Sequence, residues 1–124
     1  MRTMTLIVAA LAVILAPSGA YGQKSTEMFI PIGKSPGLSG KVTYMGKIGT
    51  VDAETKLITD PAGDWKATVT AKTQIWLDRS SAKLPNREGT FADLVPGRFV
   101  EVKYEGKERK RSGPAEWIKI EVRS

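Results

Sequence analysis

The chain has 124 residues, which is the length of one small domain. It contains neither Cys nor His, so disulfide scaffolds, zinc fingers, Cys or His nucleophiles and Ser-His-Asp triads are excluded. Lys and Arg number 19 against 13 Asp and Glu, which gives a formal net charge of +6 at pH 7. With 41% hydrophobic residues, the composition is that of a globular protein and not of a disordered one.

Residues 1–22 have the layout of a secretory signal peptide. Arg2 supplies a positive charge, residues 6–16 are an unbroken apolar run, and residues 20–22 carry small side chains at both ends. This pattern predicts cleavage before Gln23, with a cut two residues earlier as the second choice. The apolar run spans only about 16 Å as a helix, against about 30 Å of bilayer hydrocarbon, which argues against a membrane anchor. We therefore expect an exported protein, periplasmic or secreted, without stable membrane insertion after cleavage.

The chain after the predicted cleavage site divides into two parts. Residues 23–39 are expected to be an N-terminal extension, and residues 40–124 are expected to form the domain. The extension carries an apolar segment at 28–33, followed by a turn-rich run. We expect the apolar segment to pack on the domain as a lid or an edge strand. The alternative is that it docks on a partner protein.

Hydrophobic residues beyond Lys41 recur with a period of two, which predicts strands and no long helix. Glycines at Gly46 and Gly49 are typical of a bulge or a barrel corner. Five or six short strands at about ten-residue spacing predict an all-β fold, most simply a small OB-like barrel. The expected strands are 47–52, 57–59, 65–72, 74–78, 100–104 and 118–122, with one helical turn at 90–94.

Alternation along the last two strands also predicts which side chains face the core. Val102 and Ile120 are expected to face inward, and Lys103 and Lys119 are expected to face solvent.

Several short motifs recur in the same order in a known group of domains. These motifs are Gly49-Thr50-Val51-Asp52, the turn Thr90-Phe91-Ala92-Asp93-Leu94, the step Val95-Pro96-Gly97 and the final strand Ala115-Glu116-Trp117-Ile118-Lys119-Ile120. In this order the chain resembles bacterial exported domains of the domain-of-unknown-function 5666 type, over roughly residues 46–122. The resemblance implies a small OB-like barrel and export, and it implies no catalytic residue. The chain departs from the group by its long connection at 79–90 and by its segment at 28–33.

Motifs that could carry catalysis or hold a metal ion are incomplete. Residues 80–83 match the Ser-x-x-Lys pattern of penicillin-recognising enzymes, but the Ser-Asp-Asn and Lys-Thr-Gly motifs of that group do not occur. Residues 33–35 lack the spacing of a phosphate-binding loop. Asp60 and Asp64 are too few for calcium, which takes six to eight oxygen ligands. We therefore expect no enzyme activity, no metal and no cofactor.

A basic cluster lies in the predicted loop before the last strand. It consists of Lys107, Arg109, Lys110 and Arg111, and Lys103 precedes it on the strand. OB-type barrels bind oligonucleotides and oligosaccharides through one strand face and its flanking loops. A cation cluster at such a loop favours phosphate, sulfate or carboxylate polymers. The alternative is a solvated hairpin that two nearby glutamates partly neutralise.

Two tryptophans could extend that site. Trp76 and Trp117 are out of phase with the aliphatic residues beside them, so both are predicted to face away from the barrel core. Exposed beside cations, they would provide stacking faces for bases or sugar rings. The alternative is that they cap the barrel ends or lie beneath the segment 28–33. That segment needs an apolar surface to cover, which favours the second arrangement.

The sequence thus predicts an exported, non-enzymatic binding module. Its expected ligand is an anionic polymer, an envelope component or a partner protein. The alternative is a structural or assembly protein of the cell envelope that pairs through residues 28–33. The sequence does not predict an oligomeric state.

Export can be tested on the protein isolated from its native host. We expect intact-mass measurement to give a chain that begins at Gln23, because the small residues of 20–22 mark the cleavage site. Recovery of a chain that still carries residues 1–22 would contradict the prediction.

Overall fold

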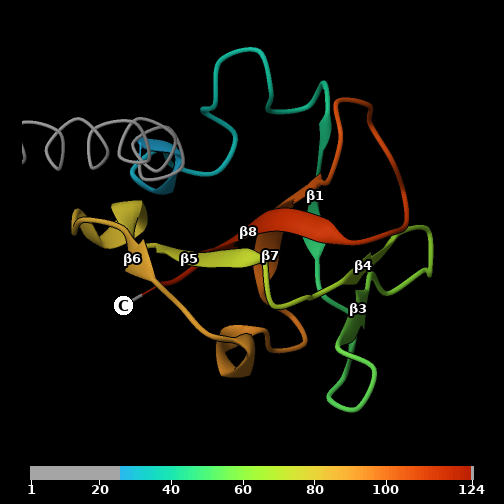
Figure 1. The fold of residues 1–124 in the computed structure, drawn as a ribbon. Helices are drawn as coiled ribbons and strands as arrows, with labels where there is room; N and C mark the ends of the chain where they lie inside the picture. Colours follow the sequence, from blue (N-terminus) through green and yellow to red (C-terminus); the bar gives the residue numbers. More distant parts are fainter. Residues whose placement is uncertain (1–25, 124) are drawn as a thin grey trace, which may run out of the picture.

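The structure is a computed structural model that describes residues 26–123 (Figure 1). The predicted signal peptide and its cleavage site lie outside these residues. Within them, no helix is long and apolar enough to cross a membrane. The elements, in chain order, are β1 (Thr43–Lys47), β2 (Thr50–Asp52), β3 (Leu57–Thr59), β4 (Lys66–Thr68), β5 (Gln74–Asp78), the 3-10 turn η1 (Ser80–Ala82), β6 (Arg87–Glu88), the 3-10 turn η2 (Phe91–Asp93), β7 (Phe99–Tyr104) and β8 (Ala115–Glu121).

The strands form two sheets, so the predicted all-β class is confirmed. The larger sheet has the order β1-β7-β8-β5-β6, and the smaller has the order β2-β3-β4. β5 and β8 run parallel, whereas the other named pairs are antiparallel. The hydrogen-bonded ladders belong to two sheets, and they do not form one closed barrel.

Some predicted boundaries differ from the observed ones. The strand predicted at 47–52 is two strands, β1 and β2, because the chain turns from one sheet into the other at Ile48 and Gly49. The long connection at 79–90 contains η1 and the short strand β6, which the sequence did not indicate. The predicted helical turn is η2, where Thr90 and Asp93 form a capping box.

The chain passes from the larger sheet to the smaller one without losing its backbone hydrogen bonds. Ile48 N donates to Arg98 O at 2.9 Å, and Gly97 N donates to Ile48 O at 2.7 Å, which continues the β1–β7 pairing. Gly49 N donates to Thr59 O at 2.6 Å, which begins the β2–β3 pairing. These hydrogen bonds matter because a backbone N–H or C=O group that is buried without a partner costs free energy.

The second connection between the sheets is the segment 111–114, which precedes β8. Lys66 N donates to Arg111 O at 2.7 Å, and Thr68 N donates to Gly113 O at 3.0 Å. Residues 111–114 thereby run along the free edge of β4, with an isolated bridge between Thr68 and Pro114. This segment is held in place by the smaller sheet before it enters the larger one as β8.

The core lies between the two sheets. Val102 and Ile120 have no exposed surface, so the predicted inward phase of β7 and β8 is confirmed. Tyr104 is buried beside them, and its hydroxyl donates to Lys66 O at 2.6 Å. Burial raises the pKa of Tyr104 above its usual range, with smaller contributions from Tyr44 and Asp60. The clustered core residues are Ile48, Ile58, Trp65, Ala67, Ile75, Leu77, Leu94, Val100, Val102, Tyr104, Ala115, Ile118 and Ile120.

Gly49 is required by a close approach of two backbone segments. A Cβ at this position would lie 2.5 Å from Pro61 N and 2.6 Å from Pro61 Cα, so the backbone would have to move. A Cβ on Gly46 would meet only side-chain atoms, at 3.4 Å.

We therefore expect Gly49→Ala to destabilise the domain by about 1–3 kcal/mol, the usual cost of overpacking. Gly46→Ala is the matched control, and it should cost less. Thermal melts followed by circular dichroism measure both, and equal losses for the two variants would contradict the assignment of Gly49 as the corner residue.

Candidate anion-binding surfaces

The larger sheet has a second face, opposite the core, which we call the outer face. Side chains of β1, β7, β8 and β5 that point to this face form three rows across the strands. The first row is Thr43, Lys103, Trp117 and Gln74, the second is Met45, Glu101, Lys119 and Trp76, and the third contains Lys47, Phe99, Glu121 and Asp78.

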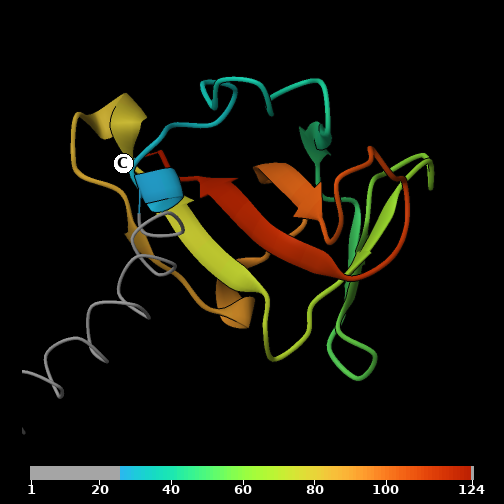
Figure 2. The ribbon, with the colours of Figure 1, turned by 45° about the horizontal axis from the view of Figure 1, so that its top comes forward.

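Residues 27–35, which we call the covering segment, lie over part of this face. Gly33 N donates to Glu101 Oε1 at 2.9 Å, and Ile32 N donates to Asp78 Oδ2 at 2.8 Å. The segment is also tied to the connection after η1, because Asn86 Nδ2 donates to Met28 O at 3.1 Å. Figure 2 shows the blue and cyan start of the described chain passing over the ends of β5 and β8. The segment packs as a lid and does not add an edge strand to either sheet.

Lys119 is enclosed between the sheet and the covering segment. Its side chain has no exposed surface, so the expectation that it faces solvent is wrong. Lys119 Nζ lies 2.8 Å from Glu27 Oε1, donates to Ser35 Oγ at 3.0 Å and stands 4.5 Å from the Trp117 ring centroid. The predicted phase of β8 is right, but the face to which Lys119 points is covered.

Glu101 is the opposite charge on the neighbouring strand, directly across from Lys119. It is also fully buried. One carboxylate oxygen accepts from Gly33 N, and the other accepts from Thr43 Oγ1 at 2.7 Å. The covering segment thus supplies a carboxylate to the buried lysine and backbone N–H groups to buried carboxylates, as buried charges require.

Trp76 and Trp117 point away from the core, as predicted, but they are covered. Each is only 2% exposed, and their ring centroids lie 5.8 Å apart. Both rings are therefore buried on the outer face, where Lys119 and the residues that enclose it lie against Trp117, and neither ring offers an exposed stacking face.

The basic loop before β8 separates into two kinds of cation. Lys103 Nζ lies 2.8 Å from Glu116 Oε1 and also donates to Gly106 O, and Lys110 Nζ donates to Glu105 O at 3.0 Å. These two side chains brace the hairpin.

The other cations of the loop, Lys107, Arg109 and Arg111, are exposed. None of them forms an ion pair with another residue of 26–123. Trp117 follows the loop in sequence but lies on the covered face, so the loop cations and this ring do not form one joint site.

Burial leaves the surface more basic than the sequence total suggests. Of the 19 Lys and Arg, two precede residue 26, so residues 26–123 contain 17 of them and all 13 Asp and Glu. Asp60, Asp78 and Glu101 are buried, whereas Lys119 is the one buried cation among these residues. The remaining 16 cations and 10 carboxylates give the surface of this part of the chain a net charge of +6, against +4 for the whole of it.

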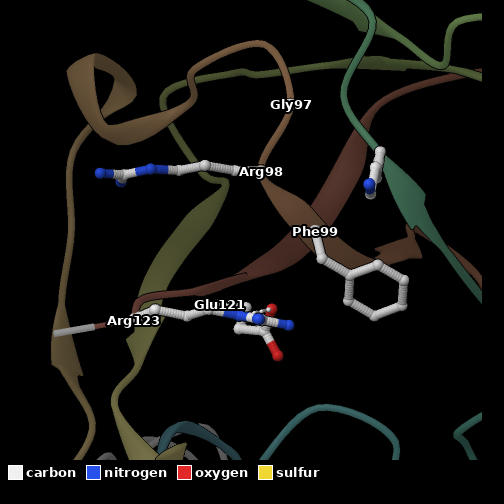
Figure 3. Close-up of a pocket in the computed structure, with 6 residues that line it drawn as sticks. Gly97, Arg98, Phe99, Glu121 and Arg123 are labelled. Atoms are coloured by element: carbon white, nitrogen blue, oxygen red, sulfur yellow. Dashed lines mark hydrogen bonds and ion pairs between the residues drawn. The ribbon is translucent and has the colours of Figure 1, made fainter. Parts of the chain in front are cut away.

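A cavity of about 600 Å³ opens at the third row of the outer face, beyond the covering segment (Figure 3). Arg123 Nε lies 3.2 Å from Glu121 Oε1, and Arg98 Nη1 donates to Asp93 O at 3.1 Å. The lining residues are Lys47, Gly97, Arg98, Phe99, Glu121 and Arg123. Sequence reasoning missed this group because its members come from three separate parts of the chain, near residues 47, 98 and 122. Only the strand register brings these parts together, and no sequence motif spans them.

Among residues 26–123, no three Asp or Glu side chains are grouped so that they could hold a metal ion. The two carboxylates of the predicted turn act separately. Asp60 Oδ1 accepts from Trp65 N at 3.0 Å, and Asp64 is exposed.

Comparisons of the chain with protein families, with curated proteins and with solved structures gave no match. The resemblance to domains of the 5666 type therefore stays a prediction from the sequence.

Because Lys119 is enclosed, its replacement should lower the free energy of unfolding of the domain. Lys119→Gln should cost about 3 kcal/mol, the low end of the range for losing one partner of a buried ion pair, because Glu27 keeps some contact with water. Lys66→Gln is the control, since Lys66 is exposed on β4. Urea unfolding measures the difference, and equal stability of the two variants would show that the buried pair contributes nothing.

Proposed function

We propose that the domain is an exported, non-enzymatic binding module for an anionic polymer of the cell envelope. The observation that carries this proposal is the separation of charge described above: three carboxylates and one ammonium group are buried, so the surface bears an excess of cations. Such an excess raises the local concentration of anionic partners and accelerates their association. Export through the predicted signal peptide and the resemblance to domains of the 5666 type belong to the same proposal.

The basic loop is the surface that presents this charge most openly. Lys107, Arg109 and Arg111 extend from a hairpin whose return limb is hydrogen bonded to β4. Because Lys103 and Lys110 donate hydrogen bonds to backbone carbonyl groups of the hairpin, the exposed cations stand on an anchored loop and not on a free tail. A polymer with repeated negative charges can contact several of them at once and release its counterions.

The alternative, an assembly protein that pairs through residues 28–33, has less support. The backbone N–H groups of Ile32 and Gly33 are bonded within the domain, so they do not offer a free edge to another strand. Phe29 is 58% exposed on the same segment, but one exposed ring is ordinary for a soluble surface.

Retention on a heparin column tests the proposal. The triple variant Lys107→Gln/Arg109→Gln/Arg111→Gln, which keeps Lys103 and Lys110, should elute at lower salt than the parent, because each lost contact with a charged group lowers the salt slope by about 0.7–0.9, as for nucleic acid phosphates. The control, Lys34→Gln/Lys41→Gln/Lys72→Gln, changes the net charge equally at exposed positions elsewhere.

Two results would contradict the proposal. One is failure of the parent to bind heparin at low salt. The other is the same shift for both triple variants, which would reduce the loop to a solvated hairpin that affects retention only through net charge.

A further inference from the structure

We propose that the cavity at the third row of the outer face binds one carboxylated sugar ring of an anionic polysaccharide. This inference rests on the proposed function and names the chemical class of its ligand. The site is distinct from the basic loop, because the cavity lies at the start of β7 and the end of β8 and the loop lies at the other end of that hairpin.

The covering segment reaches the third row only at Asp78, and the cavity opens at the other end of that row. Contacts from residues 27–35 satisfy Glu101 and Lys119 in the second row and Asp78 at the far end of the third. Phe99, on β7, is opposite Lys47 on β1, and this part of the row stays open. A volume of about 600 Å³ is within the range of small-molecule sites, which is about 300–1,000 Å³.

The charges around the cavity match a ligand with one carboxylate. Lys47, Arg98 and Arg123 approach it from three separate parts of the chain, and Glu121 is the one acid among the lining residues. Figure 3 shows Arg123 beside Glu121, the Phe99 ring at the start of β7 and the Arg98 side chain extending away from that ring. Arg98 uses one nitrogen for Asp93 O and Arg123 uses Nε for Glu121, so each guanidinium keeps donors for a carboxylate.

Glu121 and Phe99 fit the rest of a sugar ring. A carboxylate among cations accepts hydrogen bonds from hydroxyl groups, which a sugar offers in number and a simple inorganic anion does not. Phe99 is half-buried and presents an aromatic surface at the cavity, on which the apolar side of a pyranose ring can pack.

A single-stranded nucleic acid fits less well. Proteins that bind such strands stack successive bases on several aromatic side chains along a basic groove. Here Phe99 is the single aromatic residue that lines the cavity, and Trp76 and Trp117 of the same sheet face are covered.

Titration calorimetry with trigalacturonate, a carboxylated trisaccharide, tests the inference in 0.15 M NaCl. Maltotriose is the uncharged probe, and a thymidine oligonucleotide is the competing polymer class. We expect the parent to bind trigalacturonate and not maltotriose. Lys47→Gln/Arg123→Gln should weaken binding at least tenfold, whereas the loop control Lys107→Gln/Arg109→Gln, with the same change of charge, should stay within twofold of the parent.

A third variant tests the aromatic contact without changing charge. Phe99→Leu should weaken trigalacturonate binding severalfold and leave its salt dependence unchanged. Melting curves confirm that each variant is folded before binding is compared.

Four outcomes would overturn the inference: no binding of trigalacturonate by the parent, equal binding of maltotriose, equal weakening by the cavity and loop variants, or tighter binding of the oligonucleotide at the cavity. Heparin retention separates this failure from failure of the proposed function. A parent that is retained on heparin but does not bind trigalacturonate refutes the cavity site alone, and a parent that does neither refutes both.

Discussion

The ammonium group of Lys119 has no contact with solvent, and this one constraint determines how the outer face of the larger sheet is built. A buried ammonium ion needs a carboxylate and further acceptors, and Glu27 and Ser35 provide them from the covering segment. Once that segment is in place, its backbone N–H groups reach Glu101 and Asp78, and the two tryptophans are shielded. The larger sheet therefore buries one face against the core and part of the other beneath the covering segment.

The same constraint shapes the surface. Asp78 and Glu101 on the covered face and Asp60 at the turn after β3 are buried, whereas Lys119 is the one buried cation of residues 26–123, so the exposed side chains carry more positive charge than the composition alone gives. Two groups of cations lie at the ends of the β7–β8 hairpin, one in the basic loop and one around the cavity. Six strand residues separate the two places, or about 20 Å at 3.3 Å per residue. A polymer of several units is long enough to reach from one to the other.

Local alternation was sufficient to predict the strands and their inward side chains, because a period of two depends only on neighbouring residues. It correctly gave the phase of Val102 and Ile120, and it gave the direction of Lys119 and Trp117. It could not show that a second face is covered, since this depends on a segment more than 80 residues away. The cavity could not be predicted for a related reason. Lys47 and Phe99 lie side by side only because of the β1–β7 register, which no sequence motif specifies.

The ion pair between Glu27 and Lys119 joins residues 92 positions apart. In a chain that is made from its N-terminus, the covering segment therefore exists long before the strand on which it docks. Contacts this distant in sequence close slowly, because the intervening chain must first lose its freedom. Ile32 and Gly33 meet their partners on β5 and β7, whereas Glu27 reaches Lys119 only when β8 is in place. The enclosure of Lys119 therefore requires residues from both ends of the described chain, and a chain that lacks β8 cannot complete it.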